Sequence, residues 1–117
     1  MRVKRGTVRR RSRSRILKLA EGFRGRRKSN FKLAERSVQK ALKYAYRDRR
    51  VKKRDFRGLW IIRINAAARI NGMSYSLLIR GLKAANIELD RKSLASLAVN
   101  YPLAFKEVAL KAQAALA

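Results

Sequence analysis

The sequence of 117 residues contains no cysteine and no histidine, one proline, and only seven acidic residues. Without cysteine the chain cannot form disulfides or thiolate metal sites, and without histidine most zinc and haem chemistry is excluded as well. Serine–histidine and cysteine–histidine nucleophiles are excluded for the same reason. The carboxylates are scattered and form no paired constellation, so we expect no enzyme and no cofactor.

Long apolar runs are also missing. The apolar run 59–62 is far shorter than the roughly 20 residues that cross a membrane as a helix. Residues 1–15 contain no apolar stretch of the kind found in a secretory signal peptide. We therefore expect a soluble protein with no membrane partner.

Positive charge is what the sequence has in excess. Lysine and arginine total 32, which gives a formal net charge of +25 and predicts a polyanionic partner. Residues 1–57 carry 24 basic and 4 acidic side chains, whereas residues 58–117 carry 8 and 3. Apolar residues show the opposite trend, with 19 in the first segment and 36 in the second. This contrast predicts a basic extension over 1–57 and a globular domain over 58–117.

The basic extension has too little apolar material to fold alone. Ordering the backbone costs roughly 1–2 kcal/mol per residue, which a few scattered apolar side chains, many of them alanine, do not offset. We expect residues 1–57 to be largely unfolded or loosely helical when free and to become ordered on a polyanion. The alternative is a disordered basic tail that adds only non-specific affinity.

The apolar spacing within this extension predicts helices. A short helix is expected from about residue 8 to residue 21, and a long one from about 29 to 71. The long helix begins with a narrow apolar seam formed by Phe31, Ala34, Val38, Ala41 and Ala45. Between residues 47 and 57 positive charge lies on every face, an arrangement that is unstable in water and that surrounding phosphates would stabilise.

Residues 58–117 are predicted to form a compact helical domain without a sheet. We expect an inward stripe of Leu59, Ile62, Ala66 and Ile70, ended by Gly72 as a helix C-cap. Ser74 and Asp90 are expected to cap the next two helices, and Pro102 lies in the first turn of the last one. Trp60 is expected in the core or at its edge. The other predicted core residues are Leu78, Leu82, Ala85, Leu94, Leu97, Ala98, Phe105, Val108, Ala112 and Leu116. The fold class is therefore all-α.

Two groups of residues are candidates for binding RNA. In the extension, arginine favours bidentate phosphate contacts, and Tyr44 and Tyr46 can stack on unpaired bases. In the domain, residues 63–76 surround a turn and a helix N-terminus suited to phosphate. The alternatives are that Tyr44 packs beside the helix seam and that 63–76 is an ordinary solvated face. The predicted contacts are Arg2, Lys4, Arg5, Arg9, Arg10, Arg11, Arg13, Arg15, Arg24, Arg26, Arg27, Lys28, Tyr44, Tyr46, Arg47, Arg49, Arg50, Lys52, Lys53, Arg54, Arg57, Arg63, Arg69, Ser74, Tyr75 and Ser76.

Charge alone leaves two other classes of protein open. A protein that compacts or repairs DNA would also be basic, although the sequence contains no recognisable major-groove docking motif. A membrane-active cationic peptide would carry its charged and apolar faces on one helix, whereas here they are separated along the chain.

Several sequence runs resemble the bacterial large-subunit ribosomal protein L20 family. They are 44–50 (YAYRDRR), 54–69 (RDFRGLWIIRINAAAR) and 71–76 (NGMSYS), with 2–6 (RVKRG) and 22–25 (GFRG) nearer the start. The similarity extends over nearly the whole chain, and it is most specific between residues 44 and 76.

The resemblance implies a basic extension buried in large-subunit rRNA and a helical domain seated on an rRNA junction. It also implies a role in early assembly of the large subunit, neighbouring large-subunit ribosomal proteins as partners, and no part in peptide-bond chemistry. The expected location is the large ribosomal subunit in the bacterial cytoplasm, with an organelle origin left open. In several bacteria the family's C-terminal domain also represses its own operon, which makes the chain's own messenger RNA a further candidate partner.

Overall fold

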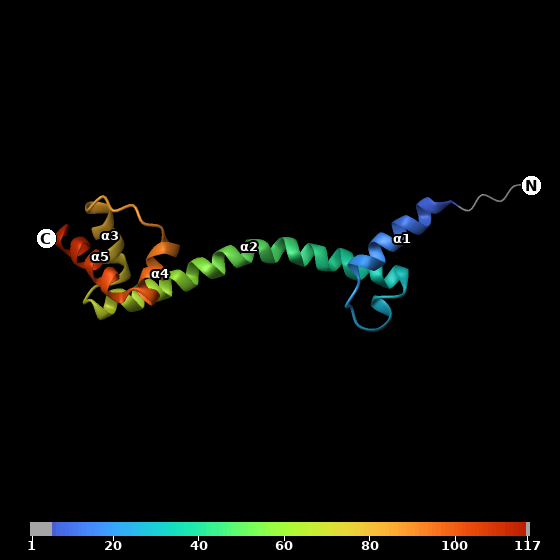
Figure 1. The fold of residues 1–117 in the computed structure, drawn as a ribbon, viewed down its shortest axis with the longest axis horizontal. Helices are drawn as coiled ribbons and strands as arrows, with labels where there is room; N and C mark the ends of the chain where they lie inside the picture. Colours follow the sequence, from blue (N-terminus) through green and yellow to red (C-terminus); the bar gives the residue numbers. More distant parts are fainter. Residues whose placement is uncertain (1–5, 117) are drawn as a thin grey trace, which may run out of the picture. The chain divides into compact units, whose positions relative to one another are not determined.

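The computed structural model describes residues 6–116, and these residues form helices joined by short loops (Figure 1). The α-helices are α1 (Thr7–Leu19), α2 (Phe31–Ile70), α3 (Tyr75–Ala84), α4 (Arg91–Asn100) and α5 (Pro102–Ala114), and a short 3-10 helix, η1, spans Gly25–Arg27. No strand occurs within residues 6–116. The predicted all-α class, with a long helix and a smaller helical region, is confirmed.

The ends of the helices follow from local chemistry. The Ser74 hydroxyl accepts a hydrogen bond from the Leu77 N–H (3.4 Å) at the start of α3, and the Asp90 carboxylate accepts one from the Ser93 N–H (3.0 Å) at the start of α4. Hydrogen bonds from Ser93 also hold the pKa of Asp90 below its ordinary value. Gly72 follows α2 with φ +76°, a left-handed conformation that favours glycine. The predicted caps are therefore confirmed.

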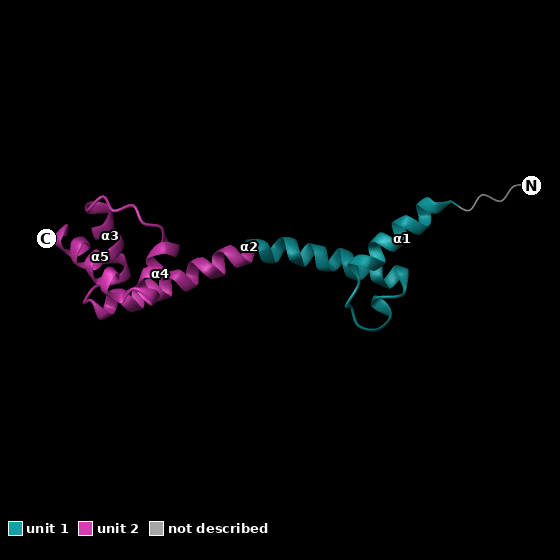
Figure 2. Cartoon of the chain, in the orientation of Figure 1, with its two compact units in different colours: residues 1–50 teal, residues 51–117 magenta. Residues whose placement is uncertain are grey.

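The chain divides into two compact units, residues 1–50 and 51–117, with the boundary inside α2 (Figure 2). Unit 1 has a small core in which Ala20, Ala34 and Val38 are the buried residues among 6–50, with apolar side chains from α1 and the following loop packed against them. The predicted seam on α2 is thus confirmed at Ala34 and Val38. It is wrong at Ala41, which is exposed because the small core reaches only the first turns of α2.

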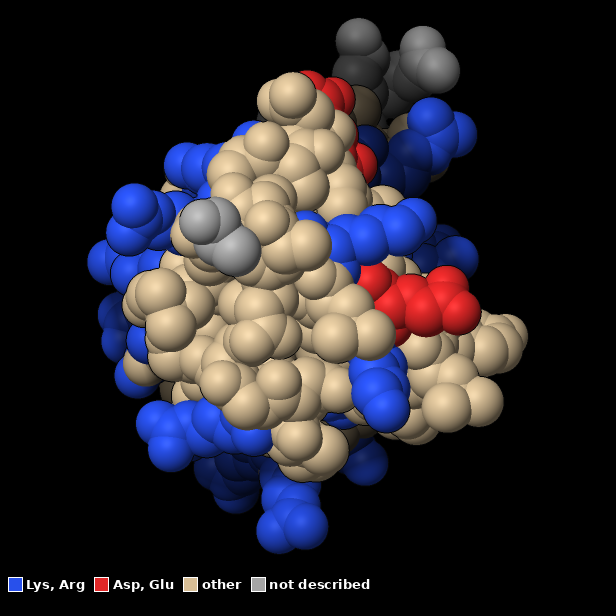
Figure 3. Space-filling view, turned by 90° about the vertical axis from the view of Figure 1, so that its left-hand side faces the viewer, with Lys and Arg blue, Asp and Glu red and all other residues tan. Residues whose placement is uncertain are grey.

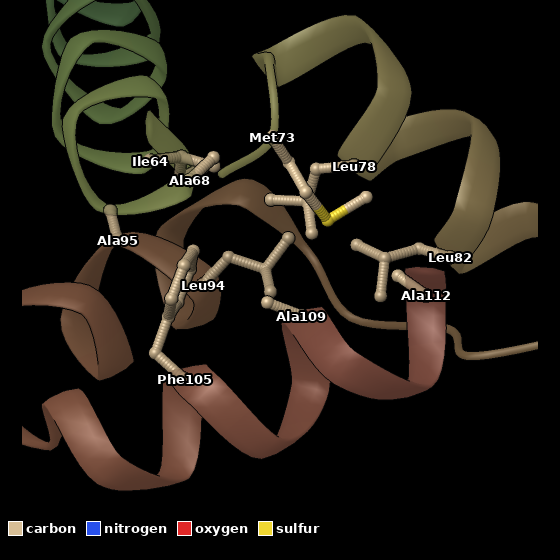
Figure 4. Close-up of a cluster of buried hydrophobic side chains, with 10 residues drawn as sticks. All are labelled: Ile64, Ala68, Met73, Leu78, Leu82, Leu94, Ala95, Phe105, Ala109 and Ala112. Atoms are coloured by element: carbon tan, nitrogen blue, oxygen red, sulfur yellow. The ribbon is translucent and has the colours of Figure 1, made fainter. Parts of the chain in front are cut away.

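Unit 2 contains a larger core drawn from four helices (Figure 4). Its fully buried side chains include Ile64 from α2, Leu78 from α3, Leu94 from α4 and Phe105 from α5. Every core residue predicted on α3, α4 and α5 is buried or half-buried, and Trp60 packs at the core edge, as expected. α5 packs against both α3 and α4. This arrangement explains how short helices with modest apolar faces hold together.

The stripe predicted on the end of α2 is wrong. Leu59, Ile62, Ala66 and Ile70 are all exposed, and Ile70 is 85% exposed. The buried residues on this part of α2 are instead Ile64 and Ala68, with Trp60 and Ala67 packed beside the core. Because residues 59–70 are apolar on nearly every face, helical spacing fits both stripes equally well. Packing into the shared core of unit 2 decides which one is buried.

α3 and α5 approach each other closely at Gly81. A Cβ atom built on this glycine would overlap the backbone carbonyl of Ala112. Gly81 is therefore required by close packing between helices. None of the helices within residues 6–116 has the length and hydropathy needed to cross a membrane.

Candidate nucleic-acid interface

The basic side chains of unit 1 lie on the surface. Helix α1 buries none of its residues, has no acidic residue in its first turn, and exposes the five arginines predicted to bind RNA: Arg9, Arg10, Arg11, Arg13 and Arg15. The residues at and around η1 that were predicted to bind RNA are exposed as well: Arg24, Arg26, Arg27 and Lys28. The predicted contacts Arg2, Lys4 and Arg5 lie outside the described residues.

The middle of α2 forms a second basic region. Its seven predicted cations are all exposed and follow the helix around every face: Arg47, Arg49, Arg50, Lys52, Lys53, Arg54 and Arg57. Within residues 6–116 the only ion pair joins Arg47 Nε to Asp48 Oδ1 at 2.7 Å, and both side chains are exposed. The hydrogen bond to Asp48 and the charge of its carboxylate raise the pKa of Arg47. The other six cations have no carboxylate partner among the described residues, so their charge is available to an external anion.

Aromatic rings alternate with these cations. Tyr44 is 43% exposed and Tyr46 is 57% exposed, so neither is a core residue. The guanidinium carbon of Arg47 lies 4.7 Å from the centre of the Tyr44 ring, and that of Arg50 lies 3.9 Å from the centre of the Tyr46 ring. Such cation–π contacts hold arginine side chains beside aromatic surface on which a base can stack.

The predicted contacts near Gly72 have mixed roles. Arg63, Arg69, Ser74 and Ser76 are exposed, but the Ser74 hydroxyl already serves as the cap of α3. Tyr75 is half-buried against the core. Two further polar side chains at this turn are used internally: the Asn65 Oδ1 accepts a hydrogen bond from the Tyr75 backbone N–H, and the Asn71 Nδ2 donates one to the Ala67 backbone carbonyl. Much of the polar chemistry at this turn therefore holds the turn in shape.

Sequence reasoning missed two features. The Arg91 Nε donates a hydrogen bond to the Tyr75 hydroxyl at 2.9 Å, and no spacing rule could indicate a partner sixteen positions away. Arg36 and Lys40 were not selected, although steps of four place them on one face of α2 with Tyr44. That signal was present in the sequence.

Not every face is basic. The face of unit 2 drawn in Figure 3 is mainly uncharged. Within the described part of the chain no three acidic side chains lie close enough together to hold a metal ion. The arrangement suits an extended anion bound over many separate contacts.

Comparison with known proteins agrees with these features. A family model described as Ribosomal protein L20 matches residues 2–108. The chain belongs to the ribosomal protein L20 family. The resemblance noted between residues 44 and 76, and near the start of the sequence, is thereby confirmed.

The relatives are close and cover nearly the full length. The chain is 62% identical over 116 residues to the large ribosomal subunit protein bL20 of Desulforapulum autotrophicum. The aligned region covers 99% of this chain and 100% of that protein. It is 61% identical over 113 residues to the bL20 proteins of Geobacter sulfurreducens and Citrifermentans bemidjiense, with 97% of each chain covered. Membership of this family indicates a structural part in the ribosome.

Proposed function

We propose that this protein binds large-subunit rRNA directly and promotes early assembly of the large (50S) subunit in the bacterial cytoplasm, with no part in peptidyl transfer. The observation that carries the proposal is the set of exposed cations on α1, around η1 and on α2, of which one alone has a carboxylate partner within residues 6–116. Membership of the L20 family supports a ribosomal polyanion over any other.

The two parts of the chain have different roles in binding. Cations of residues 1–57 neutralise phosphates that rRNA folding brings close together, while residues 58–117 fix the position on one rRNA junction. The small core of unit 1, with two alanines and one valine buried, supports an extension that becomes ordered on RNA. The ten-residue core of unit 2 supports a domain that folds alone. The division at 57/58 stays a prediction.

Salt dependence gives the first test. If about eight phosphates are contacted, log K falls with log salt at a slope near −7, because each duplex phosphate contact contributes about −0.9. Filter binding to purified large-subunit rRNA over a range of salt concentrations measures this slope. A slope near zero would contradict the proposal.

The alternative function is non-specific DNA compaction. Filter binding to large-subunit rRNA and to duplex DNA of equal length distinguishes the two, since the proposal predicts clearly tighter binding to rRNA. Equal affinity for both would favour the alternative.

The partners we propose are rRNA, neighbouring large-subunit ribosomal proteins and the chain's own messenger RNA. The last of these requires that residues 58–117 bind their own messenger RNA and lower its translation. A translation assay with and without added protein tests this directly, and unchanged translation would exclude the regulatory role.

A further inference from the structure

A groove in unit 1 lies between the loop that follows α1 and the first turns of α2. It is open to solvent and has a volume of about 890 Å³, which lies within the roughly 300–1,000 Å³ typical of pockets for small ligands. Five cations line it: Arg24, Arg26, Arg27, Arg36 and Lys40. None of the lining residues is acidic. The groove is therefore a concave site with strongly positive walls.

The remaining lining is mostly apolar and aromatic: Phe23, Leu33, Ala41 and Tyr44. Leu33 is 42% exposed and Tyr44 is 43% exposed, and neither belongs to the core of unit 1. Phe23 differs, because it packs against that core and thus anchors the loop to α2. The groove accordingly offers apolar surface that no described residue covers completely.

The shape of the loop depends on two glycines. Gly22 has φ +86° and Gly25 has φ +62°, and a Cβ atom added at either would meet no atom within 4 Å. Backbone conformation, and not lack of space, therefore requires glycine at both positions. These two turns carry Arg24, Arg26 and Arg27 to the wall of the groove.

An unpaired nucleotide matches both parts of this lining. Its base is a flat surface that stacks on aromatic and apolar side chains, and its flanking phosphates suit arginine. A base-paired duplex keeps its bases stacked inside and presents phosphates alone. An acidic peptide would satisfy the cations but leave the exposed Leu33 and Tyr44 surface without a flat partner. The combined chemistry thus favours an unpaired nucleotide.

We propose that this groove binds a single unpaired nucleotide of RNA, with the base against Leu33 and Tyr44 and the flanking phosphates held by the arginines of the wall. The inference rests on the proposed function, because rRNA supplies the unpaired nucleotide. It adds a specific site to an otherwise distributed interface.

The test compares two pairs of substitutions that leave the net charge unchanged. The groove pair is Leu33→Ala with Tyr44→Ala. The control pair is Leu103→Ala with Tyr101→Ala, which removes the same side-chain types from exposed positions at the start of α5, outside the groove and outside the predicted RNA contacts. The probes are a short RNA duplex with one bulged 2-aminopurine and the same duplex without the bulge. Full-length protein is used, and circular dichroism of each complex checks that helix content is retained.

We expect the native protein and the control pair to bind the bulged duplex at least about five-fold more tightly than the paired one, the lower end of what stacking contributes. Binding should quench the 2-aminopurine fluorescence. The groove pair should lose this preference and the quenching while keeping the same salt slope, because its charge is unaltered.

The inference would be overturned if the groove pair and the control pair lost the preference equally, or if the groove pair kept it. Displacement of the bulged probe by polyglutamate as effectively as by RNA would also overturn it. Equal binding of both duplexes by the native protein, together with preference for rRNA over duplex DNA, would reject the groove and leave the proposed function standing. Loss of preference for rRNA over DNA would reject the proposed function. The comparison of bulged and paired duplexes would still show whether the groove binds an unpaired nucleotide.

Discussion

Replacing three neighbouring cations on α2 should weaken rRNA binding in a way that depends on salt. Lys52, Lys53 and Arg54 are exposed and have no ion pair within the described residues. The proposal predicts that replacing each of the three with glutamine removes one phosphate contact. With about −0.9 per duplex contact, or about −0.7 for single strands, the slope of log K against log salt should become shallower by about 2 to 3.

The matched control removes equal charge elsewhere. Lys83 on α3 and Lys106 and Lys111 on α5 are exposed, and their replacement by glutamine changes the net charge by the same amount. We expect this variant to change the slope by less than about 1. Filter binding to large-subunit rRNA at several salt concentrations measures both. Equal changes in the two variants would refute the reasoning, because they would show that total charge, and not the α2 surface, governs binding.

The remaining predictions concern unit 2 and use the fluorescence of the single tryptophan, Trp60, during urea or thermal unfolding. Ile64→Ala should lower stability by about 2–5 kcal/mol because it empties a fully buried site, whereas Ile62→Ala should stay within about 0.5 kcal/mol; the reverse order would contradict the correction to the predicted stripe. Gly81→Ala should lower the free energy of unfolding by about 1–3 kcal/mol, because the added methyl group overlaps α5. An unchanged unfolding midpoint would contradict this and show that the two helices can separate there. The pKa of Asp90 is depressed in the folded state, so its cap stabilises α4 above about pH 4 and is lost as the pH falls through the folded pKa. Between about pH 6 and pH 3 the native protein should therefore lose more stability than Asp90→Asn, and parallel losses would count against this cap.

The ends of the helices could be predicted from the sequence because each depends on only a few neighbouring residues. Ser74, Asp90, Pro102 and Gly72 each act within one helical turn, and the structure confirms them. The inward faces of α3 to α5 were also predicted from helical spacing: Leu78 and Leu82 on α3, Leu94 on α4 and Phe105 on α5 are buried.

The face of α2 that meets the core could not be predicted in the same way. Residues 59–70 are apolar on nearly every face, so the choice of Ile64 over Ile62 depends on the residues of α3, α4 and α5 that share its core. The groove was missed for a similar reason, since it requires the loop after α1 to return to α2. The hydrogen bond from Arg91 to the Tyr75 hydroxyl likewise joins elements that no local pattern connects.

Hydrogen exchange of the full-length protein, free and bound to large-subunit rRNA, tests most directly whether residues 1–57 become ordered on RNA while residues 58–117 fold alone. In the free protein we expect rapid exchange throughout α1 and residues 31–57, and slow exchange for the buried parts of α3, α4 and α5. Addition of rRNA should slow exchange in the first group by orders of magnitude and alter the second far less. Strong protection of α1 and residues 31–57 without RNA, equal to that of α3 to α5, would contradict the account.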